Sequence, residues 1–235
     1  RSESPEFEYN RAVALNRTKS TLDNMKKKHP KVFQSSLEKF QKNIETDSPR
    51  FFRVPHESNR KPNGCAYWIP LFSVWQKQKA RIVFDAAAKT GGRCLNDTLL
   101  QGPDRNNSLR AVIHRFRKHP YAATADIENM FHQVAIPEEQ TTYMRFFWYC
   151  DNDPTKELVE YRSRVHLMGL KSSPALANLA VRYAARQDPP MNGDSWLKED
   201  DLLDPQQQNR KREPDETERI LTKSFYVDDS LISAS

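Results

Sequence analysis

The sequence lacks the features of secreted, zinc-bound and membrane proteins. It holds three cysteines in 235 residues and no CxxC pair, so it predicts neither a disulfide framework nor a zinc site. No apolar run approaches the roughly 18 residues of a membrane span, and the first ten residues hold no signal-peptide stretch. We therefore expect a soluble protein, with no membrane partner, in a reducing intracellular setting.

Apolar residues are also scarce, while positive charge is in excess. The apolar fraction is 37%, which predicts a modest core. Lys and Arg number 37 against 31 Asp and Glu, and the resulting net charge of +6 favours a polyanionic partner such as nucleic acid. A basic surface that only keeps the protein soluble explains the same excess, so charge alone leaves both interpretations open.

Hydrophobic periodicity predicts an α+β protein with antiparallel hairpins. The basic run QKQK is expected to turn the first hairpin, and DNDP the second. Residues 188–218 have little to bury and are expected to form a loose loop. Helices are predicted at 11–44, where Pro30 separates two of them, at 108–118 and at 175–187; strands are predicted at 66–75, 80–86, 121–127, 144–150, 158–167 and, as two short strands, 224–235.

Asp228 and Asp229 lie between strand-like runs, so a hairpin would bring both carboxylates to its tip. Their charges repel at that distance, and a divalent cation relieves the repulsion most simply. A solvated turn explains an isolated YVDD about as well.

Asp126 changes that balance because it ends an apolar strand that we expect to be buried, where an unpaired charge is costly. If this strand lies beside the YVDD hairpin, three carboxylates converge. Such a cluster suits two-metal phosphoryl transfer. The alternative is a strand-terminal aspartate that caps the following turn.

Three segments, TADIENMFHQV, GLKSSPALAN and FYVDD, resemble the palm motifs of reverse transcriptases in order and context. The segments RIVFDAAAKTGGRCLNDTLLQGP and VEYRSRVHLMG are similar to the BEL/Pao retrotransposon branch in particular. The resemblance runs from about Arg11 to the end and is strongest from residue 66. It implies the fingers and palm of a right-hand polymerase, with an antiparallel palm sheet backed by helices.

The resemblance also implies a division of the chain. Residues 1–65 would form an N-terminal helical segment and a connection, 66–120 the fingers, and 121–235 the palm. The last part would include a remaining fingers hairpin at about 144–167 and the loose loop. We expect the thumb and the ribonuclease H domain to be absent.

Single residues take roles from the same resemblance. Asp126 and Asp228 match the metal-ligating aspartates, with the backbone carbonyl of Ile127 as a further ligand. Asp229 matches the second aspartate of the YxDD box. Phe131 matches the aromatic steric gate, which predicts deoxynucleotide substrates; a core aromatic is the alternative.

The implied nucleotide-binding residues lie on two further segments. Arg81 matches the fingers arginine that contacts the incoming triphosphate, and either Lys79 or Lys77 matches the nearby lysine. Solvated hairpin charges are the alternative for the lysines. Gly169 matches a glycine where backbone approaches the nucleotide or template closely, and Met168 stands where retroviral enzymes have glutamine.

Together these residues imply an RNA-directed DNA polymerase that extends a primer on an RNA or DNA template with deoxynucleoside triphosphates and two Mg²⁺ or Mn²⁺ ions. The expected location is a retrotransposon particle in the cytoplasm, with nuclear access left open, as is the oligomeric state. The alternative is a catalytically incompetent polymerase-derived fragment that binds nucleic acid. A metal-dependent nuclease explains the carboxylates but neither Phe131 nor the Arg81 hairpin.

Overall fold

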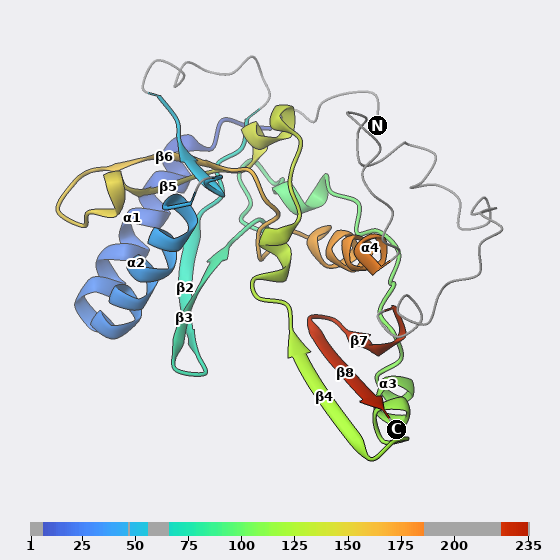
Figure 1. Cartoon of the computed structure of the whole chain (residues 1–235). Coiled ribbons are helices and arrows are strands. Elements are labelled where there is room, and N and C mark those ends of the chain that lie inside the picture. Colours follow the sequence, from blue (N-terminus) through green and yellow to red (C-terminus); the bar gives the residue numbers. More distant parts are fainter. Residues whose placement is uncertain (1–6, 47, 56–65, 186–221, 235) are drawn as a thin grey trace. The chain divides into compact units, whose positions relative to one another are not determined.

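The computed structural model describes residues 7–46, 48–55, 66–185 and 222–234 (Figure 1). They form two compact units: unit 1 comes from residues 1–103 and 129–175, and unit 2 from residues 104–128 and 176–235. The predicted loop at 188–218 lies outside the described residues. The helices are α1 (Arg11–Lys28), α2 (Pro30–Ile44), α3 (Leu109–Phe116) and α4 (Ser173–Ala185), and the strands are β1 (Phe51–Arg53), β2 (Leu71–Gln76), β3 (Lys79–Phe84), β4 (Tyr121–Asp126), β5 (Arg145–Tyr149), β6 (Leu158–Ser163), β7 (Phe225–Tyr226) and β8 (Asp229–Ala234).

The break between α1 and α2 follows from Pro30, as predicted. Proline disfavours helical geometry at the residue before it, and His29 accordingly has φ −134° and ψ 59°. Pro30 itself then occupies the first turn of α2, where its missing N–H costs nothing. The two helices lie on one side of unit 1, beside β2 and β3 (Figure 1).

An aromatic core fills unit 1 around the sheet β1-β6-β5, whose strands pair antiparallel. All five residues of β5 are buried. Phe40 of α2 stacks on Trp148 with ring centroids 4.7 Å apart, and Phe146 stacks on Tyr161 at 6.0 Å. Such pairs add about 0.5–1.5 kcal/mol each beyond the area they bury.

The predicted strand at 66–75 is shorter in the structure, because Pro70 has no N–H to donate to a ladder. Residues 67–69 instead run along β5: the N–H of Ile69 donates to the carbonyl of Arg145 at 2.7 Å, and the N–H of Arg145 to the carbonyl of Tyr67 at 3.3 Å. Only from Leu71 onward does the chain pair with β3.

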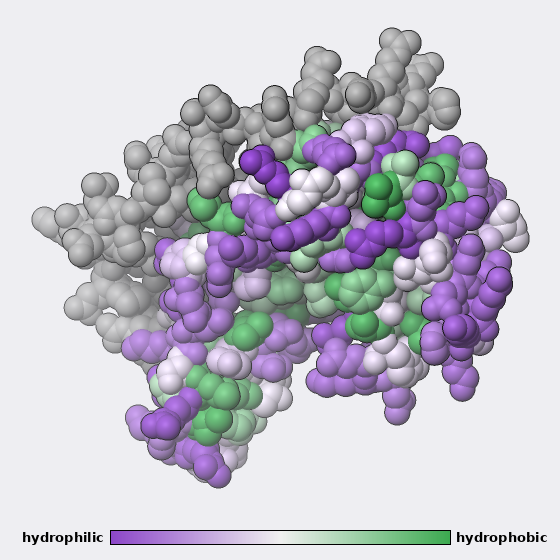
Figure 2. Space-filling model, turned by 180° about the vertical axis from the view of Figure 1, so that it is seen from behind, coloured by the Kyte–Doolittle hydropathy of each residue, from purple (hydrophilic) through white to green (hydrophobic). Residues whose placement is uncertain are grey.

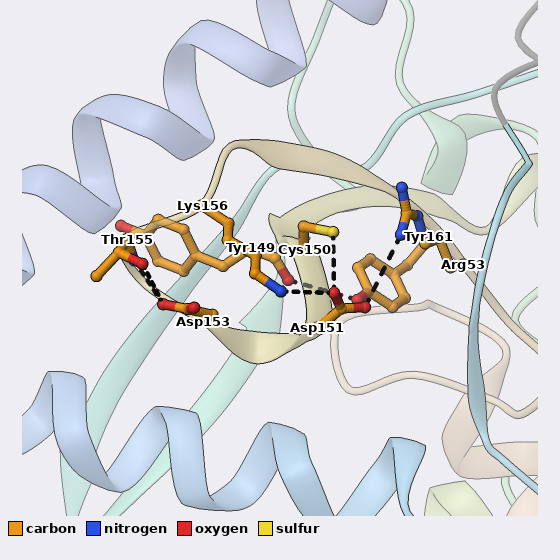
Figure 3. A network of polar contacts seen from close by, with 8 residues as sticks. All are labelled: Arg53, Tyr149, Cys150, Asp151, Asp153, Thr155, Lys156 and Tyr161. Carbon is orange, nitrogen blue, oxygen red and sulfur yellow. Dashed lines mark hydrogen bonds and ion pairs between the residues drawn. The ribbon is translucent and has the colours of Figure 1, made fainter.

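Local turn chemistry forms both predicted hairpins of unit 1. Lys77 and Gln78 join β2 to β3 with φ of 48° and 61°, as a two-residue turn of the primed kind requires. At the DNDP turn, the Asp151 carboxylate accepts from Lys156 Nζ at 2.9 Å and lies 3.8 Å from Arg53 Nη1 (Figure 3). The hydrogen bond from Lys156 holds the pKa of Asp151 below its ordinary value. These contacts confirm DNDP as a turn.

Two histidines of unit 1 lie in low-polarity surroundings. The His132 ring packs against Phe51, with centroids 5.7 Å apart, and its Nδ1 atom is buried without a hydrogen-bond partner among the described residues. The Nδ1 atom of His166 lies 3.2 Å from the hydroxyl of Ser173, which is itself buried.

Unfolding is expected to become easier as the pH falls below about 6.5. Burial lowers the pKa of both His132 and His166 from 6.5 to about 4, helped at His132 by the charges of Arg50 and Lys39. Between pH 6.5 and pH 4 the two rings therefore bind protons in the unfolded chain but not in the folded chain. The free energy of unfolding keeps its full value at a pH above 6.5, the pKa of histidine in the unfolded chain. It falls toward pH 4 by at most about 1.4 kcal/mol per pH unit for each ring.

Urea unfolding at pH 7 and pH 5 measures this loss. The control is the double variant His132→Gln, His166→Gln, whose free energy of unfolding should depend less steeply on pH. Equal slopes in the two proteins would show that these rings do not control acid stability.

Unit 2 contains the sheet β4-β8-β7, again antiparallel, with α3 packed against β8 and β7. The expectation that the strand ending at Asp126 is buried is wrong, because every residue of β4 is exposed. β4 lies at the edge of the sheet, its alanines cover little area, and Tyr121 remains 71% exposed. An apolar run thus indicated a strand correctly but not its burial.

The structure confirms a mixed protein with antiparallel sheets, while its division into fingers and palm stays a prediction. Hydrophilic side chains dominate the face of the molecule shown in Figure 2, with smaller hydrophobic areas among them. Among the described residues, every helix is too short or too polar to cross a membrane.

Candidate metal centre and nucleotide-binding residues

Three carboxylates meet at one end of the sheet in unit 2. The ladder pairs Asp126, the last residue of β4, directly with Asp229, the first residue of β8. Asp228 precedes Asp229 in the turn after β7. One carboxylate oxygen from each of the three lies within 4.8 Å of the others, so the convergence expected from the sequence is present. Their role as metal ligands stays a prediction.

Backbone pairing creates this geometry. The N–H of Ile127 donates to the carbonyl of Asp228 at 3.0 Å, which extends the ladder one step beyond β4. The adjacent pair, Asp126 and Asp229, is then of the type in which facing side chains approach most closely. Two like charges are therefore held together by hydrogen bonds that do not involve their side chains.

The turn that carries Asp228 is strained. Val227 has φ of 59°, a region that β-branched residues rarely enter, at a typical cost of about 1–3 kcal/mol. The pairing of Tyr226 with Asp229 closes the hairpin around it. Such strain persists only where the surroundings determine the backbone, and it is common at functional sites.

Side-chain hydrogen bonds connect β7 and β8 to α3 and to the residues just before it. The amide of Asn107 donates to the carbonyls of Thr222 at 2.8 Å and Phe225 at 2.7 Å. The hydroxyl of Ser233 in β8 donates to the carbonyl of Arg115 at 2.8 Å. Sequence reasoning missed Asn107, because nothing near it in the chain signals partners more than a hundred residues away.

The carboxylate cluster fits a divalent cation. Two oxygens on one Mg²⁺ lie at most about 4.2 Å apart, since each sits about 2.1 Å from the ion. The observed spacing of up to 4.8 Å therefore needs only small side-chain rotations. Asp126 and Asp229 are exposed and Asp228 is half-buried, so an ion can enter from solvent. The backbone carbonyl of Ile127, which was predicted as a further ligand, also belongs to unit 2.

Unit 1 holds the predicted phosphate-binding cations. Arg81 and Lys79 are two residues apart on β3, so they lie on one face of the hairpin, and both are exposed. Ala80 between them is buried, and its N–H donates to the hydroxyl of Ser35 on α2 at 3.1 Å. The strand is thus held from one side while its cations face solvent. Lys77 lies in the turn itself.

Met168 and Gly169 lie against the end of the same strand. The N–H of Phe84 donates to the carbonyl of Met168 at 3.1 Å. Gly169 has φ of 118°, and a Cβ there would overlap the carbonyl oxygen of Phe84. Glycine is therefore required by the backbone of β3, whereas the sequence had suggested only the approach of a nucleotide or template.

The predicted residues thus gather in two groups. The carboxylates and Ile127 belong to unit 2, and the hairpin cations and the Met168–Gly169 backbone belong to unit 1. Phe131 also belongs to unit 1, in a short 3-10 helix (Met130–Gln133), and is half-buried. Partial burial does not distinguish a steric gate from a core aromatic, so the role of Phe131 stays a prediction.

Comparison with known proteins finds no family model and no curated protein that matches the chain. Many solved structures are similar to it, among them two of foamy viral protease-reverse transcriptases. One is the foamy viral protease-reverse transcriptase dRH in complex with double-stranded DNA, at 17% identity and TM-score 0.49, over 79% of this chain and 23% of that one. The other is the foamy viral protease-reverse transcriptase in complex with an RNA/DNA hybrid, at 14% identity and TM-score 0.47, over 99% of this chain and 22% of that one. The chain spans less than a quarter of each.

Proposed function

We propose that this chain is the fingers and palm of a reverse transcriptase, which adds deoxynucleotides to a primer 3′ end on an RNA or DNA template. The observation that carries the proposal is the convergence of Asp126, Asp228 and Asp229 at the joined ends of β4 and the β7–β8 hairpin. The sequence contexts TADIENMF and FYVDD support it, because adjacent carboxylates on paired strands suit two-metal phosphoryl transfer.

In this proposal Asp126, Asp228 and the carbonyl of Ile127 hold two Mg²⁺ or Mn²⁺ ions. When bound, such ions activate the primer hydroxyl and stabilise charge on the transferring phosphate. The Asp229 carboxylate lies within reach of both other aspartates, so it adds to the negative field that attracts the ions.

The residues of unit 1 would handle the nucleotide. Arg81 grips phosphate oxygens through its planar fork, while Lys79 adds a point charge, and together they offset the charge of the departing pyrophosphate. Phe131 would lie under the sugar and exclude a 2′-hydroxyl. The backbone at Gly169, beside Met168, would approach the nucleotide or template closely.

We further infer a BEL/Pao retrotransposon as the source, on the segments RIVFDAAAKTGGRCLNDTLLQGP and VEYRSRVHLMG. The corresponding location is a retrotransposon particle in the cytoplasm, with nuclear access left open, and the corresponding partners are template, primer and deoxynucleoside triphosphates. The net charge of +6 suits the polyanionic partner.

Primer extension on an RNA template tests the proposal. We expect the wild-type chain to extend the primer with Mg²⁺ or Mn²⁺, and the Asp228→Asn variant to lose this activity. A matched control is Asp104→Asn, an exposed aspartate of unit 2 whose replacement can still accept the N–H of Asn106.

The alternative outcome is equally informative. Salt-sensitive binding of primer-template without extension in either metal would count against a polymerase. It would favour a polymerase-derived fragment that binds nucleic acid.

A further inference from the structure

Asn96 holds two peptide groups of the loop that follows Leu167. Its Nδ2 atom donates to the carbonyl of Gly169 at 2.9 Å, and its Oδ1 atom accepts the N–H of Lys171, also at 2.9 Å. The donor and the acceptor of one side-chain amide thus both bind backbone groups, which lie two residues apart. Asn96 is 73 residues away from Gly169 in the chain, so only the tertiary fold creates this contact.

The position of Asn96 is itself fixed. It lies in a short 3-10 helix (Leu95–Asp97), where Leu95 is 2% exposed and the Asp97 carboxylate accepts the N–H of Cys94 at 3.0 Å. The N–H of Asn96 donates to the carbonyl of Ala86 at 3.0 Å. The side-chain amide is therefore anchored just beyond the end of β3.

The loop also contacts β3 directly. Phe84 donates its N–H to the carbonyl of Met168, and the missing Cβ of Gly169 allows the close approach described above. Together with these contacts, the two hydrogen bonds of Asn96 connect this loop to the strand that carries Arg81. We call this set of contacts the bracket. The bracket lies entirely in unit 1.

Other residues already hold the loop to the core. Leu167 and Leu170 are buried, and the buried hydroxyl of Ser173 donates to the carbonyl of Leu167 at 3.0 Å. Gly169 and Lys171, the residues that Asn96 binds, are exposed. The Asn96 amide thus orders the exposed side of the loop, where a ligand would lie. Because this amide is itself half-exposed, it contributes little to the global free energy of unfolding.

We propose that Asn96 is a positioning residue for the nucleotide, which sets the Gly169–Lys171 backbone at a fixed place relative to Arg81 on β3. The inference rests on the proposed polymerase function. Small displacements of groups that orient a substrate lower catalytic efficiency about a hundredfold, so loss of this bracket is expected to weaken nucleotide use more than folding.

Two measurements on Asn96→Ala test the proposal. Hydrogen exchange of the Lys171 amide, followed by NMR, is expected to accelerate about tenfold or more, because this N–H loses its acceptor. In primer extension, KM for the deoxynucleotide is expected to rise about tenfold or more, with a smaller change in kcat. Asn96→Asp retains the acceptor, so Lys171 should exchange as slowly as in the wild type.

Asn152→Ala is the matched control. Its amide also holds distant backbone, since Nδ2 donates to the carbonyl of Leu37 at 2.9 Å, and Oδ1 accepts from Trp148 Nε1 at 2.7 Å. This variant is expected to lose stability without a change in KM for the nucleotide. An equal rise in KM in both variants would reduce Asn96 to a structural role.

The outcomes separate this inference from the function beneath it. Unchanged Lys171 exchange in Asn96→Ala would overturn the bracket, whether or not the chain is a polymerase. Faster exchange with a wild-type KM would overturn the positioning role. A wild-type chain that never extends a primer would overturn the proposed function, and the positioning role with it.

Discussion

Replacing Asp126 by asparagine is expected to lower the rate of primer extension by about a thousandfold or more. The substitution keeps the shape of the side chain but removes one of the three charges that converge in unit 2. Losing a single electrostatic contact to a transition state typically costs about a hundredfold to a thousandfold, and loss of a metal ligand acts on every phosphoryl oxygen that the ion contacts.

The same variant is expected to fold at least as well as the wild type. Asp126 faces Asp229 across the ladder, and like charges in that position destabilise a sheet by roughly 0.2–1 kcal/mol. Without divalent metal, Asp126→Asn should therefore unfold at the same or a slightly higher temperature. With Mn²⁺ added, the wild type should gain stability because the ion binds only the folded cluster, and the variant should gain less.

Thermal unfolding with and without Mn²⁺, together with primer extension, measures both effects. Asp104→Asn again serves as the control and should behave as the wild type in both assays. If Asp126→Asn gains as much from Mn²⁺ as the wild type, the ion binds elsewhere. Normal extension by the variant would show the assignment of Asp126 to be wrong.

Replacing Glu160 by glutamine is expected to lower the free energy of unfolding by about 3–5 kcal/mol. Glu160 in β6 and Arg145 in β5 form an ion pair at 3.2 Å, and both side chains are 1% exposed. Burial lowers the pKa of Arg145, and the charge of Glu160 opposes that shift. Removing the carboxylate leaves a buried guanidinium without its counter-charge, which is far more costly than losing a surface ion pair.

Glu160 also accepts a hydrogen bond from Arg11 Nε at 2.6 Å, but the Arg11 side chain is 32% exposed, so the larger part of the expected loss comes from the buried Arg145. Glutamine retains the volume of the side chain, so packing around β5 and β6 is preserved. Glu138→Gln is the control, because Glu138 is exposed and lies 3.8 Å from Arg164, so it should change stability by less than about 1 kcal/mol. Urea unfolding measures both variants, and equal small losses would show that the Arg145 pair is solvated in solution.

Much of this fold follows from neighbouring residues alone. Pro30 ends one helix and begins the next because its ring restricts the residue before it. The QKQK and DNDP segments turn because their residues adopt positive φ between two strand-forming runs. The placing of Asp228 and Asp229 in one turn was equally predictable from the sequence, whereas their convergence with Asp126 depended on whether its strand pairs with theirs, as it does in the structure.

The tertiary structure decided the rest, because burial and side-chain contacts depend on residues distant in the chain. The apolar composition of β4 predicted a buried strand, but its place at the sheet edge leaves it exposed. The need for glycine at 169 comes from a carbonyl of β3, and the roles of Asn96 and Asn107 come from backbone partners 73 to 118 residues away. Sequence periodicity reports contacts a few residues apart, whereas these contacts exist only once the chain has folded.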